Sequence, residues 1–221
     1  MSATLSVAAL LAIGAVRLAR AFAGGPPPQR PLEADRVLRQ QHGVPPWPIG
    51  ELPEHRQGRL VGNVRALERT LTAPLSGRAC VYYVVLVEQS VFPGWQDRIV
   101  ERRGVAFALD DASGRAIIDP ARASVALAFD HHEELRALDP ATPAQQAVLA
   151  RHGHPGAAAS RLRFVEAVLS VGERVTVVGI GTRRPHIAWS VESDYRSATP
   201  TRMHLAGSDA EPLSISSHYL R

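Results

Sequence analysis

CVYYVVLVE, at residues 80–88, decides the fold, because β-branched and aromatic side chains follow one another in it without a glycine or proline. ERVTVVGIGT, at residues 173–182, is also rich in β-branched residues and has two glycines near its end, Gly179 and Gly181. Shorter β-rich runs separated by turn residues lie at 59–67, 98–109, 115–119, 124–129, 203–206 and 212–217. This succession of short strands predicts a mainly β fold.

Helices are few in this pattern. Residues 142–152 predict one internal helix, with Thr142 as its N-cap and Pro143 at its first position, and residues 32–42 predict a short one. DDASG, at residues 110–114, predicts a tight turn within a hairpin. Alternating βαβ units are absent, which disfavours a doubly wound nucleotide-binding fold. We therefore expect a small antiparallel OB-like barrel or a sandwich, with one or two helices.

The N-terminus carries an apolar run at residues 3–16, followed by Arg17 and Arg20. This run predicts a transmembrane helix at residues 1–23 that contacts the lipid bilayer through residues 3–23. The arginines after the run predict a cytoplasmic main domain. A cleaved secretory signal is the alternative, because AFA at residues 21–23 resembles a cleavage site; the domain would then be secreted or periplasmic.

The chain therefore divides into three predicted parts. The transmembrane anchor covers residues 1–23, and a proline-rich linker with the short helix covers residues 24–57. The β domain covers residues 58–218. We expect a single-pass membrane protein that holds a β domain beside the bilayer.

The charge pattern gives little support for a nucleic-acid-binding protein. The formal net charge is +4 and all 25 basic residues are arginine, but they form no long run with interleaved aromatic residues. Aromatic residues make up 5% of the chain, which leaves few rings for stacking on bases. No nucleic acid is expected, although an OB-like groove for a ligand or nucleic acid stays open as an alternative.

The sequence contains no nucleophile elbow, HExxH motif or Walker loop. Cys80 is the single cysteine and lies in a β-rich run, so we interpret it as a buried structural thiol. His131, His132, His152 and His154 are better explained as surface residues than as metal ligands, and we expect neither a metal nor a cofactor.

Two acidic residues in the predicted turn, Asp110 and Asp111, are explained by the turn itself. We therefore predict no catalytic residue. The alternative is a membrane-associated, hydrolase-like enzyme that uses Glu166, Asp110 with Asp111, or the histidines.

Several motifs follow one another in a familiar order: GNVRA at 62–66, LTAPLSGR at 71–78, CVYY at 80–83, VAFALDD at 105–111 and EAVLSVGERVTVVG at 166–179. This order resembles the GIDE domain, also called the beside-a-membrane domain, over residues 58–217. The family includes organellar ubiquitin ligases of the mulan type and bacterial membrane proteins. The resemblance implies a bacterial membrane protein whose domain binds partners.

The family ligases also carry a second transmembrane helix and a RING, and we expect this chain to lack both. One cysteine cannot supply the zinc ligands of a RING, so no ubiquitin ligase activity is expected.

The residues that match the family pattern have structural interpretations. The glycines fit turns, or a bulge at Gly62, and the aromatic residues fit the core. Glu166 stands in an apolar run and, if buried, needs a partner such as Arg65 or Arg78. We expect a membrane-anchored, non-catalytic binding or scaffold module with a protein partner. The family markers are Gly62, Cys80, Trp95, Phe107, Asp110, Gly114, Glu166 and Gly172.

Overall fold

The computed structural model describes residues 31–154, 161–185, 201–208 and 212–217, and it is mainly β, as the sequence predicts. The helices are α2 (Pro31–His42), α3 (Pro143–Arg151) and the short 3-10 helix η1 (Ile49–Glu51). The strands are β1 (Gln57–Ala66), β2 (Leu71–Thr72), β3 (Ala79–Cys80), β4 (Tyr82–Val91), β5 (Gly94–Gly104), β6 (Phe107–Asp110), β7 (Arg115–Asp119), β8 (Ala123–Ala126), β9 (His131–Leu135), β10 (Leu162–Leu169), β11 (Arg174–Pro185), β12 (Thr201–Ala206) and β13 (Leu213–Ser217).

The transmembrane helix predicted at residues 1–23 lies outside the described residues. Within the part of the chain that the structure describes, no helix has the length and apolar character needed to cross a membrane.

The chain forms two compact units. The barrel unit comprises Arg30–Val85, Glu101–His131 and Glu166–Arg221, and the smaller unit includes Leu86–Val100 and His132–Val165. Part of the predicted linker, namely α2 and η1, therefore belongs to the barrel unit.

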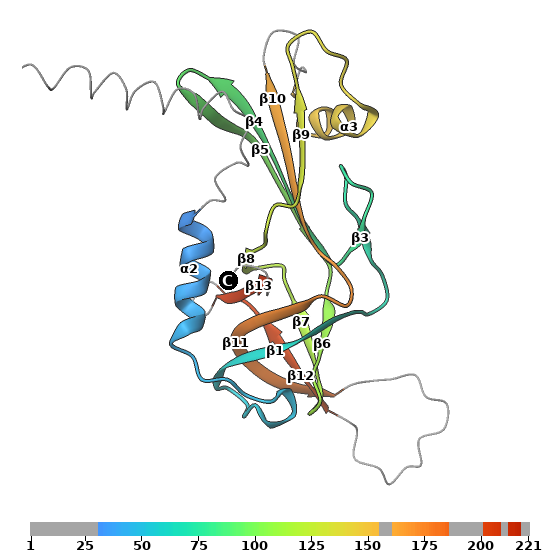
Figure 1. Cartoon of the computed structure of the whole chain (residues 1–221). Helices are drawn as coiled ribbons and strands as arrows, with labels where there is room; N and C mark the ends of the chain where they lie inside the picture. Colours follow the sequence, from blue (N-terminus) through green and yellow to red (C-terminus); the bar gives the residue numbers. More distant parts are fainter. Residues whose placement is uncertain (1–30, 155–160, 186–200, 209–211, 218–221) are drawn as a thin grey trace, which may run out of the picture. The chain divides into compact units, whose positions relative to one another are not determined.

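Five strands close the barrel in the order β1-β6-β7-β12-β11, and β1 pairs with β11 to complete the ring (Figure 1). β13 and β8 continue the sheet beyond β11. Of the two predicted alternatives, a barrel and a sandwich, the structure is a barrel. It departs from a fully antiparallel sheet at β7–β12 and β13–β8, which are parallel. Parallel partners come from distant parts of the chain, so local patterns do not reveal their direction.

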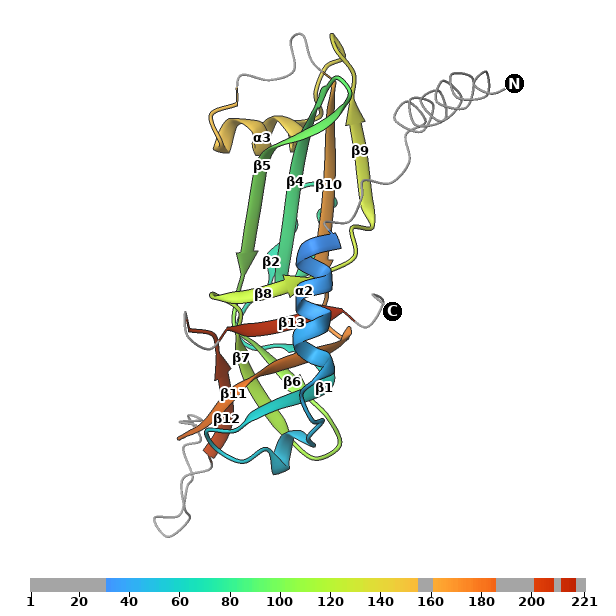
Figure 2. The ribbon, with the colours of Figure 1, turned by 90° about the vertical axis from the view of Figure 1, so that its left-hand side faces the viewer.

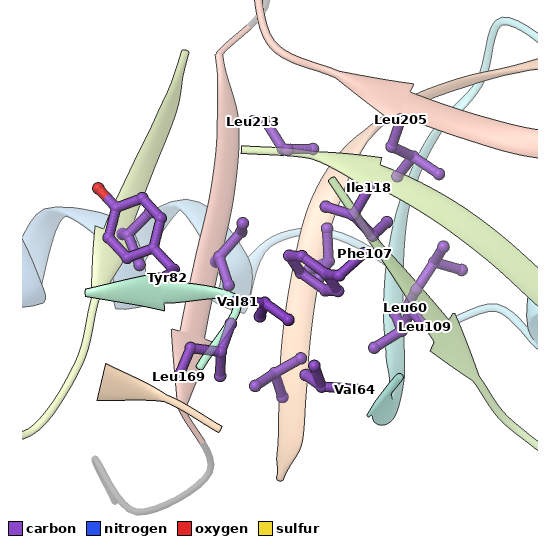
Figure 3. Packing of buried hydrophobic residues seen from close by; sticks show 14 of the residues in the cluster. Leu60, Val64, Val81, Tyr82, Phe107, Leu109, Ile118, Leu169, Leu205 and Leu213 are labelled. Atoms are coloured by element: carbon purple, nitrogen blue, oxygen red, sulfur yellow. The ribbon is translucent and has the colours of Figure 1, made fainter. Parts of the chain in front are cut away.

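The core of the barrel unit follows the two-residue alternation of its strands. On β7, Ala116 and Ile118 are fully buried, whereas Arg115 and Asp119 are exposed. Figure 3 shows Phe107 within the apolar cluster, and this ring is fully buried, as predicted for this marker. Burial of one such side chain contributes about 1.5–3 kcal/mol to stability.

Helix α2 crosses β8 and β13 and packs against them (Figure 2), which confirms the helix predicted at residues 32–42. Val37 is fully buried on its inner side. The Gln41 side chain donates to the Thr176 carbonyl at 3.4 Å and accepts from the Ser216 hydroxyl at 2.7 Å. These buried polar contacts fix the position of the helix on the sheet.

The turn predicted at residues 110–114 is confirmed between β6 and β7. One carboxylate oxygen of Asp111 accepts from the backbone amides of Ser113, at 2.7 Å, and Gly114, at 2.9 Å. The other oxygen accepts from the Ile49 amide at 2.9 Å. Asp111 therefore closes the turn and ties η1 to it.

The bulge predicted at Gly62 is wrong, because the pairing of β1 with β11 runs through Gly62, opposite Val175, without an extra residue. A Cβ at Gly62 would lie 2.6 Å from the Asp110 carbonyl oxygen. The close approach of β1 to β6 explains this glycine. Gly172 has a φ of +88°, which confirms its predicted place in a turn.

In the four-stranded sheet the order is β5-β4-β10-β9, as Figure 2 shows. The helix predicted at residues 142–152 is confirmed as α3. The Thr142 hydroxyl accepts from the Gln145 amide at 3.2 Å, and the Gln145 side chain accepts from the Thr142 amide at 3.0 Å. This capping box satisfies backbone donors at the start of α3.

Trp95, predicted as a core residue, is half-buried in the smaller unit and stacks on cations. The guanidinium carbons of Arg163 and Arg161 lie 4.4 Å and 5.5 Å from its ring centroid. Arg163 is 6% exposed and forms an ion pair with Glu88 at 2.7 Å. Trp95 therefore forms cation–π contacts with two arginines.

Candidate functional site

Glu166, the strongest candidate for a catalytic acid, lies on β10, a strand whose residues are all buried. Its side chain is 0% exposed. The carboxylate accepts from the Leu75 amide at 2.8 Å, from the Ser76 amide at 3.2 Å and from the Ser76 hydroxyl in a short hydrogen bond. Three donors therefore replace the water that this buried charge gives up.

Arg78 lies beside this carboxylate, as one of the two predicted partners. Its guanidinium is 4.0 Å from Glu166, but it forms two shorter contacts, of 2.6 and 2.7 Å, with Asp130. The Arg78 hydrogen bond holds the pKa of Asp130 below its ordinary value. The Arg78 Nε also donates to the Ser76 hydroxyl at 3.0 Å.

The other predicted partner, Arg65, lies 3.7 Å from Asp110 instead. The Glu166 network thus pins the loop between β2 and β3 to strand β10. A general acid or base must reach a substrate proton. All three donors to Glu166 come from Leu75 and Ser76 of this loop, and holding the loop in place accounts for them.

Asp110 and Asp111, the second catalytic candidates, contact different partners. Asp110 forms two 2.6 Å contacts with Arg115, and this hydrogen bonding lowers the pKa of Asp110. Burial raises the pKa of Asp111, but hydrogen bonds from the Ser113 hydroxyl and from the amides of the turn outweigh it, so the pKa of Asp111 is also lowered. Neither carboxylate has the raised pKa of a general acid.

The four histidines do not gather. His131 and His132 lie on β9, whereas His152 caps the C-terminus of α3 and His154 follows it. Within residues 31–154, 161–185, 201–208 and 212–217, no three histidine, cysteine or acidic side chains could hold a metal ion.

Cys80 is fully buried. Burial, and to a lesser degree the charge of Glu166, raise the pKa of Cys80 to about 11. The nucleophilic form of cysteine is the thiolate, which is scarce at neutral pH for such a thiol. These facts support the structural interpretation of Cys80.

The barrel wall carries a pocket of about 680 Å³ that sequence reasoning did not predict. Its lining combines the end of β1 and the segment after it, the residues before β6, and the outer faces of β7 and β12. The lining residues are Ala66, Leu67, Glu68, Arg69, Val105, Ala106, Arg115, Ile117, Arg202 and His204. We call this the wall pocket.

The register of β7 and β12 explains why side chains of these two strands reach the wall pocket. The strands are parallel, with Met203 opposite Ala116, and both of these residues point into the core. Their neighbours Arg202 and Arg115 therefore point outward on adjacent strands. In the sequence, the only sign of the wall pocket is an outward-facing arginine on each of these two strands. The parallel pairing of β7 with β12 is what brings Arg115 and Arg202 together.

Comparison of the chain with protein-family models, with curated proteins and with solved structures finds no match.

Proposed function

We propose that this chain is a membrane-anchored, non-catalytic binding module of GIDE type, which binds a protein partner through the barrel unit. The anchor is residues 1–23, and the barrel is on the cytoplasmic side because Arg17 and Arg20 follow the apolar run. The observation that carries the binding role is the wall pocket. Its volume falls in the range of ligand sites, about 300–1,000 Å³.

The connectivity of the barrel supports this use of the wall pocket. Numbered along the chain, β1, β6, β7, β11 and β12 close in the order 1-2-3-5-4-1, which is the order of an OB-like barrel. OB barrels bind ligands on the face of their second and third strands, bounded by the loop between the first two. The wall pocket combines the outer faces of β7 and β12, the third and fifth strands, with residues 67–69 and 105–106, which belong to that loop. Its described lining residues include none of β6, the second strand, so the pocket shares the third strand and the loop with that face.

A protein partner fits the lining better than single-stranded nucleic acid, the ligand of many OB barrels. Sequence-tolerant binding of nucleic acid uses phenylalanine, tyrosine or tryptophan rings on which bases stack. Among the described residues that line the wall pocket, none is of these three types. The lining offers apolar contacts and arginine, which protein interfaces favour.

The contacts of the three candidate acids support a non-catalytic role. Glu166 holds the loop between β2 and β3, Asp111 holds a turn, and Asp110 is paired with Arg115. Each of these carboxylates has a structural task that accounts for its contacts.

Chemical cross-linking in native membranes, followed by mass spectrometry of proteins that co-purify with the full chain, tests the proposal. The pocket variant is Leu67→Asp, and the matched control is Val171→Asp, because these apolar residues of the barrel unit are 39% and 44% exposed. We expect a partner that wild type and V171D recover and L67D loses. Recovery of no specific protein, or of the same proteins by all three chains, would reject the proposed function.

A further inference from the structure

We infer that the wall pocket binds a carboxylate-bearing, acidic segment of the partner protein, with apolar side chains beside the acid. This inference rests on the proposed function and names the chemistry of its partner. It is carried by the charges, the free donors and the apolar surface of the pocket lining.

The charge of the lining is positive. Arg69, Arg115 and Arg202 contribute three guanidinium groups, and Glu68 is the only carboxylate among the described lining residues. Asp110 lies next to the pocket without lining it, and it interacts with Arg115, at 2.6 Å, with Arg65, at 3.7 Å, and with the charge of Arg202. One carboxylate thus faces three guanidiniums there, and the surplus of positive charge persists.

Two guanidiniums of the pocket retain their hydrogen-bonding capacity. Among the residues that the structure describes, the Arg69 and Arg202 side chains form no hydrogen bond and no ion pair within 4.0 Å, although the charge of Arg202 helps to lower the pKa of Asp110. Each guanidinium presents five N–H donors in a planar fork that matches the two oxygens of a carboxylate. Arg115, by contrast, is held by Asp110, which fixes its position on β7.

The remaining lining is apolar. Ile117 lies between the polar residues on the outer face of β7, and Leu67, Val105 and Ala106 form part of the wall. An inorganic anion would leave this surface in contact with water. An extended peptide that carries acidic and apolar residues two positions apart covers both kinds of lining, because residues i and i+2 of an extended chain point to the same side.

Isothermal titration of the full chain in detergent micelles tests the inference. The probes are the blocked peptide acetyl-(Glu-Ser-Leu-Ser)2-amide, in which Glu and Leu share one side of an extended chain, its uncharged match acetyl-(Gln-Ser-Leu-Ser)2-amide, and an oligothymidylate. The pocket variants are Arg69→Gln and Arg202→Gln. The control is Arg36→Gln, on the exposed side of α2 and outside the pocket.

We expect the Glu peptide to bind at least about tenfold more tightly than the Gln peptide, and each pocket variant to weaken it about tenfold, because charge-assisted hydrogen bonds are lost. R36Q should bind like wild type. Equal affinities for the two peptides, unchanged affinity in both pocket variants, or binding of oligothymidylate alone would overturn the acidic ligand.

The two proposals fail in distinguishable ways. If the peptide does not bind while cross-linking still recovers a partner that depends on Leu67, the acidic ligand is rejected and the binding module stands. If the peptide binds as expected while no partner is recovered, the protein-binding function is rejected and the pocket is a site for small acidic ligands.

Discussion

Replacing Glu166 with glutamine removes a buried charge and keeps the size of the side chain. The carboxylate accepts from the Leu75 amide, the Ser76 amide and the Ser76 hydroxyl. Glutamine keeps one oxygen as an acceptor, but its NH2 group turns a donor toward another donor. At least one amide of the loop therefore loses its partner.

The expected loss of stability follows from these contacts. A hydrogen bond to a charged group contributes about 1.5–3 kcal/mol, and two such bonds are lost or weakened. Part of this loss is offset because glutamine has no charge to bury. We expect Glu166→Gln to lower the unfolding free energy by about 2–4 kcal/mol, and Ser76→Ala, which removes one hydrogen bond to this charge, by about 1.5–3 kcal/mol.

Urea unfolding measures the free energy, and amide hydrogen exchange at Leu75 and Ser76 measures opening of the loop. Both amides should exchange faster in E166Q. The control Asp119→Asn, at the exposed end of β7, removes a carboxylate that accepts only from the Ala121 amide in the described structure, and it should cost under about 1 kcal/mol. Unchanged stability and exchange in E166Q would refute the structural role of Glu166.

Other consequences concern the thiol, the close strand contact and the anchor. Between about pH 8.5, where an unfolded cysteine titrates, and about 11, the pKa of Cys80, the folded chain binds more protons than the unfolded chain. Unfolding free energy should therefore fall as pH rises through this window, and Cys80→Ala should flatten the slope; equal slopes in urea titrations would contradict the burial of the thiol. Gly62→Ala should destabilise by about 1–3 kcal/mol, because its Cβ would meet the Asp110 carbonyl at 2.6 Å, whereas Gly43→Ala, with nothing within 4 Å, should not; equal melting curves would count against the close contact. The full chain should stay in membranes after an alkaline wash, while a chain starting at residue 24 should not, and protease should reach the barrel only in permeabilised cells; digestion in intact cells would reject the cytoplasmic orientation.

Elements set by neighbouring residues were predictable from the sequence. Residues 80–88 and 173–182 carry strand signals in their own side chains. The capping box at Thr142 and the turn around Asp111 depend on partners three residues away or fewer, apart from the Ile49 contact. Such local chemistry can be read without the fold.

Features set by distant pairing were not predictable in the same way. The closure of the barrel joins β1 to β11, and the parallel pairing of Ala116 with Met203 brings two outward arginines together. The prediction that Glu166 needs an arginine was correct in part, since Arg78 is near. Its main donors are backbone amides some ninety positions away, which carry no sequence signal.

Site-specific photo-cross-linking in native membranes tests whether the wall pocket contacts a protein partner. A photoreactive residue at position 67 lies in the lining, and one at position 171 is similarly exposed outside it. We expect a discrete cross-linked protein from position 67 that position 171 does not give. The same products from both positions, or none from position 67, would contradict it.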